Sequence, residues 1–165
     1  MNVVIIAHVL AALLLLGPVT VAISMFPKLA LAARDGEAGT IGAARTMHSI
    51  TRTYGMISLL VPLLGVGVMF TDMETYLKSG FVHVSLLLSI IAWAILFFAV
   101  IPQQRLMMAG LGVADEDEDV SDPEFQARAE KARAAEWTTL KSRLAMLSGI
   151  FSLIWVVVAI LMFFI

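Results

Sequence analysis

Four long runs without an acidic or basic residue limit the structures open to this chain more than any other feature. They extend over residues 3–27, 53–71, 79–104 and 144–165, and every Asp, Glu, Lys and Arg lies outside them. A helix needs about 20 apolar residues to cross a hydrocarbon core roughly 30 Å thick. The sequence therefore predicts an all-α protein with transmembrane helices at about 3–27, 53–71, 80–102 and 142–165.

The composition agrees with this prediction. Of the 165 residues, 60% are hydrophobic and 15% are charged, whereas about half are apolar and about a quarter charged in an average soluble domain. The connecting segments are too short for a soluble domain, so we expect one membrane domain over residues 1–165. The absence of cysteine excludes disulfides, thiolate catalysis and cysteine-ligated metals.

The distribution of Lys and Arg predicts the orientation. Segment 28–52 contains four of these residues and segment 103–141 with the adjoining Arg143 contains six, whereas Lys78 is alone between the second and third runs. Loops rich in Lys and Arg remain on the cytoplasmic side. We therefore expect segments 28–52 and 103–141 to be cytoplasmic and both termini to lie outside.

Two histidines begin matching parts of the sequence. His8-Val9 opens the first apolar run and His83-Val84 opens the third, and each histidine is followed 19 residues later by a proline, Pro27 or Pro102. Two hairpins in the same orientation imply a pseudo-two-fold axis along the membrane normal. We therefore predict a four-helix bundle built from two parallel-repeat helical hairpins, with runs one and three on opposite sides of its centre.

A histidine within a membrane span is costly and needs a partner or a purpose. His8 and His83 would lie at the same depth near the outer face, so one hypothesis is that they are the axial ligands of haem b. Copper or a quinone is another ligand that they could bind. The alternative is that each ring is only hydrogen-bonded to backbone or water at the rim. His48 falls on the opposite side, near Arg45 and Arg52, and we interpret it as an interfacial residue outside this site.

The third connecting segment combines an acidic run with a helix. Residues 115–119 are all acidic, which is typical of a solvated linker, with docking to a basic partner as the alternative. Ser121-Asp122-Pro123-Glu124 predicts a helix start. We expect that helix to continue into the fourth span and to project into the cytoplasm, with Trp137 among the lipid headgroups.

Several features predict contacts with another protein. Gly149 and Ser152 lie on a face of small residues, which permits close packing of membrane helices. Phe125 and Trp137 belong to the predicted projecting helix. We expect these four residues to contact a partner, and Pro18 and Pro62 to kink their helices.

Catalysis is disfavoured because the four apolar runs contain no Asp, Glu, Lys or Arg, which transport and proton pathways usually require. No nucleotide-binding glycine motif is present. The leading hypothesis is a non-catalytic accessory subunit of a larger membrane complex, such as a respiratory supercomplex. The second hypothesis is a haem-b redox or haem-handling protein with His8 and His83 as axial ligands. If the protein is an enzyme, this hypothesis predicts a haem-linked oxidoreductase. The expected partners are the lipid bilayer and that complex, and no nucleic acid.

The residues His8, Gly17-Pro18, Phe26-Pro27 and the stretch 47–55, Met-His-Ser-Ile-Thr-Arg-Thr-Tyr-Gly, resemble an uncharacterised family of four-helix bacterial membrane proteins that is frequent in actinobacteria. The resemblance implies the bacterial plasma membrane. More distantly, the first helix with its histidine is similar to CopD-type copper-resistance proteins and to HemJ-type protoporphyrinogen oxidases. The HemJ-type resemblance implies haem at His8, but that family also relies on a lysine in a later helix, and the third run has none.

Overall fold

The computed structural model describes residues 3–164, which form helices and turns without any strand. The first span comprises α1 (Val3–Ala11), a π-helical turn η1 (Ala12–Leu16) and α2 (Gly17–Arg34). The second comprises α3 (Thr40–Ile57) and α4 (Leu60–Met69), and is followed by the short α5 (Met73–Lys78). The third comprises α6 (Gly80–Ile95), the π-helical turn η2 (Leu96–Val100) and α7 (Ile101–Gly110). The chain ends with α8 (Pro123–Ala134) and α9 (Trp137–Met162).

Four helical stretches are long and apolar enough to cross a membrane, namely Val3–Arg34, Thr40–Met69, Gly80–Gly110 and Trp137–Met162. Large apolar side chains are exposed on each of them, including Leu14, Leu63, Phe98 and Leu153. This surface suits a hydrocarbon solvent, in which helices satisfy their own backbone hydrogen bonds. The predicted all-α, multi-pass membrane architecture is thus confirmed.

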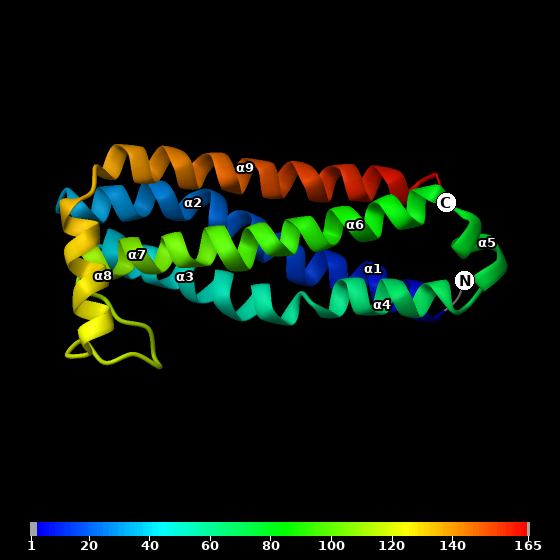
Figure 1. The fold of residues 1–165 in the computed structure, drawn as a ribbon, viewed down its shortest axis with the longest axis horizontal. Helices are drawn as coiled ribbons and strands as arrows, with labels where there is room; N and C mark the ends of the chain where they lie inside the picture. The colour runs from blue at the N-terminus through cyan, green and yellow to red at the C-terminus, as the bar shows by residue number, and fades with distance from the viewer. Residues whose placement is uncertain (1–2, 165) are drawn as a thin grey trace.

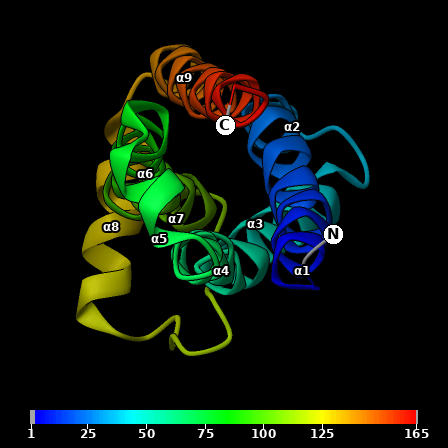
Figure 2. The same cartoon turned by 90° about the vertical axis from the view of Figure 1, so that its right-hand side faces the viewer.

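Seen end-on, the four stretches form a ring in chain order (Figure 2). The short helices α5 and α8 lie at opposite ends of the bundle (Figure 1). α2 packs on α3 and α9, α6 packs on α9, and α3 packs on α7. In the end-on view the first and third spans lie across the bundle from each other (Figure 2), as the predicted two-fold arrangement requires. We call the end that carries α8 the α8 end, and the opposite end, with α5 and both termini, the α5 end.

The buried core occupies the half of the bundle towards the α8 end. Its largest apolar members include Phe26, Leu96, Met107, Leu144 and Phe151. Towards the α5 end the helices pack mainly as two pairs, α1 with α4 and α6 with α9. Only the α8 half is therefore filled by side chains from all four spans.

The helices extend further than the predicted spans. The first continues past Pro27 to Arg34, the third continues past Pro102 to Gly110, and the second begins at Thr40. The predicted spans thus cover only part of each helix, and Ile165 lies outside the described residues. The turn between α2 and α3 uses Gly36 and Gly39 at φ of 84° and 79°, a backbone region that glycine adopts without strain.

Prolines interrupt three of the spans, in two different ways. The π-helical turns η1 and η2 directly precede the segments with Pro18 and Pro102, because proline lacks an N–H and its ring displaces the carbonyl four residues earlier. At Pro62 the helix breaks instead, between Ile57 and Leu60. Disruptions were therefore correctly predicted at Pro18 and Pro62.

The helix α8 does not continue into the fourth span. It ends at Ala134, and the extended residues Ala135 and Glu136 separate it from α9. α8 lies across the end of the bundle and packs on α7 (Figure 1). Its predicted start is confirmed, because the Asp122 side chain accepts a hydrogen bond from the Glu124 backbone N–H at 2.8 Å.

Candidate functional sites

His8 is half-buried and points from α1 towards α4. Its Nδ1 lies 3.0 Å from the backbone oxygen of Val61. A β-carbon on Gly65 would come within 3.1 Å of the ring carbon Cε1, so the glycine leaves room for the imidazole. Since a carbonyl only accepts hydrogen bonds, Nδ1 carries the hydrogen, and the neutral ring presents Nε2 as a free acceptor or metal ligand.

His83 does not share this environment. Its side chain is exposed, and its Nδ1 donates to the backbone oxygen of Ser79, the residue just before α6, at 2.9 Å. The cavity that His8 lines does not include His83 among its lining residues. The structure therefore does not bring the two predicted ligands together.

A cavity of about 560 Å³ lies between the two helix pairs of the α5 end. Most of its lining residues are apolar, and its polar members are His8, Tyr76, Ser85, Ser89 and Trp155. Ser85 is 1% exposed, and its Oγ has no hydrogen-bond partner among the described residues. The indole Nε1 of Trp155 is likewise buried without a partner in that part of the chain.

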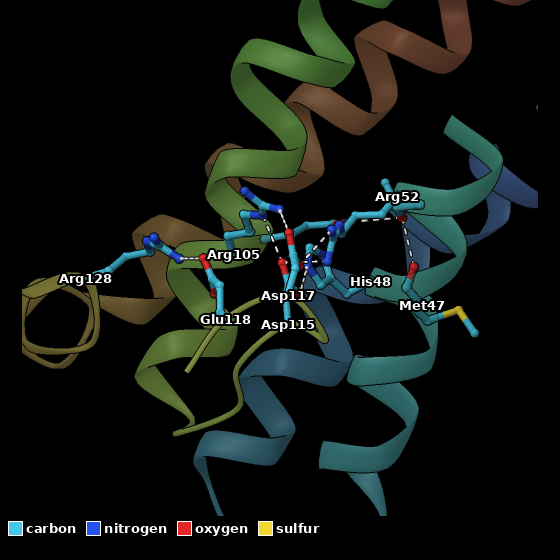
Figure 3. Close-up of polar contacts among 10 residues, drawn as sticks. Met47, His48, Arg52, Arg105, Asp115, Asp117, Glu118 and Arg128 are labelled. Carbon is cyan, nitrogen blue, oxygen red and sulfur yellow. Dashed lines mark hydrogen bonds and ion pairs between the residues drawn. The ribbon is translucent and has the colours of Figure 1, made fainter. Parts of the chain in front are cut away.

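A second polar site lies at the α8 end and is built around His48 (Figure 3). This side chain is buried on α3, with its ring centroid 6.1 Å from that of Phe26. Its Nδ1 lies 2.9 Å from Oε1 of Gln104, and its Nε2 lies 3.0 Å from Oδ1 of Asp115. Both partner oxygens can accept a hydrogen bond from the ring. The interpretation of His48 as a simple interfacial residue was wrong.

Asp115 is the centre of the charges at this site. Its carboxylate is 8% exposed, and Oδ2 lies 2.9 Å from Arg52 Nη1 and 2.9 Å from Arg105 Nε. Burial raises the pKa of this carboxyl group, but the hydrogen bond from His48 and the arginine charges outweigh it and lower the pKa to about 2. Asp115 therefore remains ionised over the physiological range.

The acidic run is thus docked on its own chain, and the expectation of a solvated linker was wrong for part of it. Asp117 pairs with Arg52 at 3.1 Å but remains 63% exposed. Glu118 pairs with Arg128 of α8 at 2.6 Å. The loop therefore covers the end of the bundle, held by one buried acid and two more peripheral ones.

A neutral side chain orients the buried histidine. Gln104 is fully buried, and its Nε2 donates to Oγ1 of Thr51 at 3.3 Å. Thr51 in turn donates to the backbone oxygen of Met47 at 2.9 Å. This chain of hydrogen bonds sets the orientation of the Gln104 amide, whose oxygen then faces His48.

A groove of about 770 Å³ opens beside this network, between α3 and the η2–α7 segment. Its rim carries Arg45, Arg52 and Arg105, and its apolar lining includes Met56 and Phe97. Sequence reasoning missed this site, although one signal was present. Arg52 and Arg105 directly flank uncharged runs at the same end of the bundle, next to an acidic segment that they attract.

The four residues predicted to contact a partner divide into two groups. Phe125 and Trp137 are each 2% exposed. Phe125 packs against Ala109 and Ala129, and the Trp137 indole donates to the backbone oxygen of Ala132 at 2.9 Å. Both side chains are buried by contacts within the chain. Gly149 is exposed and Ser152 half-buried on α9.

Neither site can be interpreted through a relative, because no family model, no curated protein and no solved structure matches this chain. The chemistry of each site therefore rests on its own residues. The cavity offers neutral hydrogen-bonding groups in an apolar lining. The polar network at the α8 end offers fixed charges that are largely paired with one another.

Proposed function

We propose that this protein is a non-catalytic membrane protein that holds a lipid-soluble small molecule in the cavity beside His8. The observation behind the proposal is the apolar cavity, two of whose lining residues, Ser85 and Trp155, carry a buried polar atom with no hydrogen-bond partner among residues 3–164. Buried polar atoms without a hydrogen bond are uncommon in native proteins. A ligand with hydrogen-bonding groups would supply the missing partners.

The lining also selects the charge and shape of the ligand. It contains no Asp, Glu, Lys or Arg, so an ion in the cavity would lose its hydration without gaining a counter-charge. His8 Nε2 accepts a hydrogen bond, Trp155 Nε1 donates one, and Ser85 does either. A neutral head with hydroxyl or carbonyl oxygens and an apolar body, as in a quinol or quinone, matches this set.

Haem b is the second candidate, favoured by the hydrogen bond from His8 to Val61. Histidines that bind metals usually donate their other ring hydrogen to a backbone carbonyl or carboxylate, which is the arrangement at His8. His8 would supply one axial nitrogen. The cavity lining contains neither His83 nor a cation for the propionates, so the residues present fit this group less well than a neutral ligand.

We further propose that the protein serves as an accessory subunit of a larger membrane complex, with the α8 end in the cytoplasm. The support for a role as a subunit is the exposed apolar surface on all four spans, together with the absence of Asp, Glu, Lys and Arg from the four apolar runs. The support for the orientation is the concentration of Lys and Arg in segments 28–52 and 103–143. Extraction in a mild detergent followed by a native gel tests this role. Migration only at the size of the isolated chain would contradict it.

The ligand proposal is tested by organic extraction and mass spectrometry of the purified protein, together with absorbance spectra of its oxidised and reduced forms. A neutral prenylated or aromatic compound at near-equal stoichiometry supports the proposal, and a Soret band selects haem. Ser85→Leu should remove the hydroxyl, narrow the cavity and so reduce retention. Ser24→Leu is the control for the substitution itself, because Ser24 is an exposed helical serine that does not line the cavity. Equal retention in both variants would contradict the proposal.

A further inference from the structure

The groove at the α8 end combines a basic rim with an apolar wall. Arg45, Arg52 and Arg105 lie on the rim, from α3 and α7, whereas Met56 and Phe97 lie further along the same helices towards the α5 end. Met56 is 58% exposed, so the groove opens sideways from the bundle. Polar and apolar parts thus follow each other along the direction in which the spans cross the membrane.

The rim lies where the spans meet the membrane surface. Arg52 directly precedes the uncharged run 53–71, and Arg105 directly follows the uncharged run 79–104. Basic residues immediately outside an apolar span lie at the level of the lipid phosphates. We therefore expect the guanidinium groups of Arg52 and Arg105 to lie level with the phosphates, with Arg45 two helical turns further out and the Met56–Phe97 wall level with acyl chains.

The charges on the rim are unequally satisfied. Arg52 and Arg105 share the buried Asp115, whereas Arg45 is exposed and forms no ion pair with any residue of the described chain. Asp117 reaches Arg52 at 3.1 Å and Arg105 at 4.0 Å, but its side chain is 63% exposed. The exposed Glu116 also lines the groove. An anion at its mouth would thus find one guanidinium without an ion pair among the described residues, in competition with the exposed carboxylates of Asp117 and Glu116.

We propose that this groove binds one anionic phospholipid. The phosphate lies between Arg45 and Arg52, in place of the Asp117 carboxylate, and one acyl chain lies along Met56 and Phe97. A zwitterionic lipid is a poorer match because its cationic head faces the arginines. This lipid site is independent of the ligand proposed for the cavity at the α5 end, so a failed test of one proposal does not affect the other.

The test is lipid binding to the detergent-purified full-length protein, counted by native mass spectrometry. Phosphatidylglycerol and phosphatidylcholine with identical acyl chains are titrated in parallel. One phosphatidylglycerol should bind with a clear preference over phosphatidylcholine. Arg45→Gln should weaken that binding about fivefold, since one basic residue near an anionic lipid contributes about 1 kcal/mol.

Arg143→Gln is the matched control, because Arg143 is an exposed arginine at the start of α9 that does not line the groove. It should leave the affinity unchanged. Asp117→Asn should increase the affinity by removing the competing carboxylate. Glycerol phosphate, which has no acyl chain, should not bind at the same concentration.

Three results would overturn the proposal: equal retention of the two lipids, equal losses in Arg45→Gln and Arg143→Gln, or binding of glycerol phosphate as strong as that of the lipid. The last result would identify the site as one for soluble phosphates. Far-UV circular dichroism of each variant confirms that the comparison is made between folded proteins.

Discussion

Replacing Asp115 by Asn removes one charge from the most strongly coupled group of the structure while keeping its size. The variant retains an oxygen that can accept the hydrogen bond from His48 at the Oδ1 position. It loses the negative charge that Arg52 and Arg105 approach at 2.9 Å each. Both arginines, about a third exposed, are then left with only Asp117 as an acidic partner.

The expected cost follows from the pKa of Asp115. A pKa lowered from 3.8 to about 2 corresponds to about 2–3 kcal/mol of folding free energy, at about 1.4 kcal/mol per pKa unit. We therefore expect Asp115→Asn to lower the free energy of unfolding by about 2–3 kcal/mol. Asp117→Asn, the control, breaks ion pairs of a mostly exposed carboxylate and should cost less than about 1 kcal/mol.

Unfolding by sodium dodecyl sulfate in mixed micelles, followed by circular dichroism, measures both values. Amide hydrogen exchange provides a local measurement, because Asp115 ties the loop 111–122 to the end of the bundle. Exchange in this loop should accelerate in Asp115→Asn and remain near the wild-type rate in Asp117→Asn.

The pH dependence gives a second check. Because the pKa of Asp115 is depressed in the folded state, its stabilisation is fully present well above pH 3.8 and is lost as the pH falls through about 2. The difference in stability between wild type and Asp115→Asn should therefore shrink on acidification, with roughly half of it remaining at pH 3. Equal stabilities of the Asp115 and Asp117 variants at pH 7, or a pH-independent difference, would refute this account of the network.

Two further predictions concern helix packing, each with a control on α9. Gly110→Ala should destabilise the protein by about 1–3 kcal/mol, because the new Cβ would lie 2.7 Å from side-chain atoms of both Trp137 and Ala132. Gly149→Ala is the control, because a Cβ on Gly149 has no atom within 4 Å. It should be neutral or slightly stabilising in the same detergent titration. Ser148→Ala should cost about 0.5–1 kcal/mol, because the Ser148 hydroxyl reaches the Ile23 backbone oxygen of the neighbouring helix at 2.8 Å. Ser152→Ala removes only a bond within its own helix and should cost less, so equal melting-temperature shifts would contradict this ranking.

The sequence was sufficient to predict the four membrane helices but not the residues at which each helix begins and ends. Uncharged runs of about 20 residues predict membrane helices because a bilayer demands them, and all four are present. The helices are longer than the predicted spans, because apolar length marks what can lie in lipid, whereas α2, α3 and α7 continue beyond the apolar runs as helices packed on one another.

At the two polar sites as well, the sequence identified the residues but not their partners. The polar residues were visible in the sequence, and His8 was singled out because a histidine in an apolar run is costly. Its partnership with His83 was inferred from a matching offset, but offset does not fix which way a side chain points around a helix. The packing of α1 on α4 turned His8 into the cavity, whereas His83 faces outwards on α6.

The tertiary structure alone decided the role of His48. Its partners Gln104 and Asp115 are 56 and 67 residues away, on a helix and a loop whose approach depends on the packing of α3 against α7. The sequence by itself determined a membrane-spanning bundle, because the cost of placing charges in lipid acts on composition alone. Only the folded chain decided which polar groups meet, because hydrogen bonds and ion pairs depend on distances of about 3 Å that no spacing along the chain specifies.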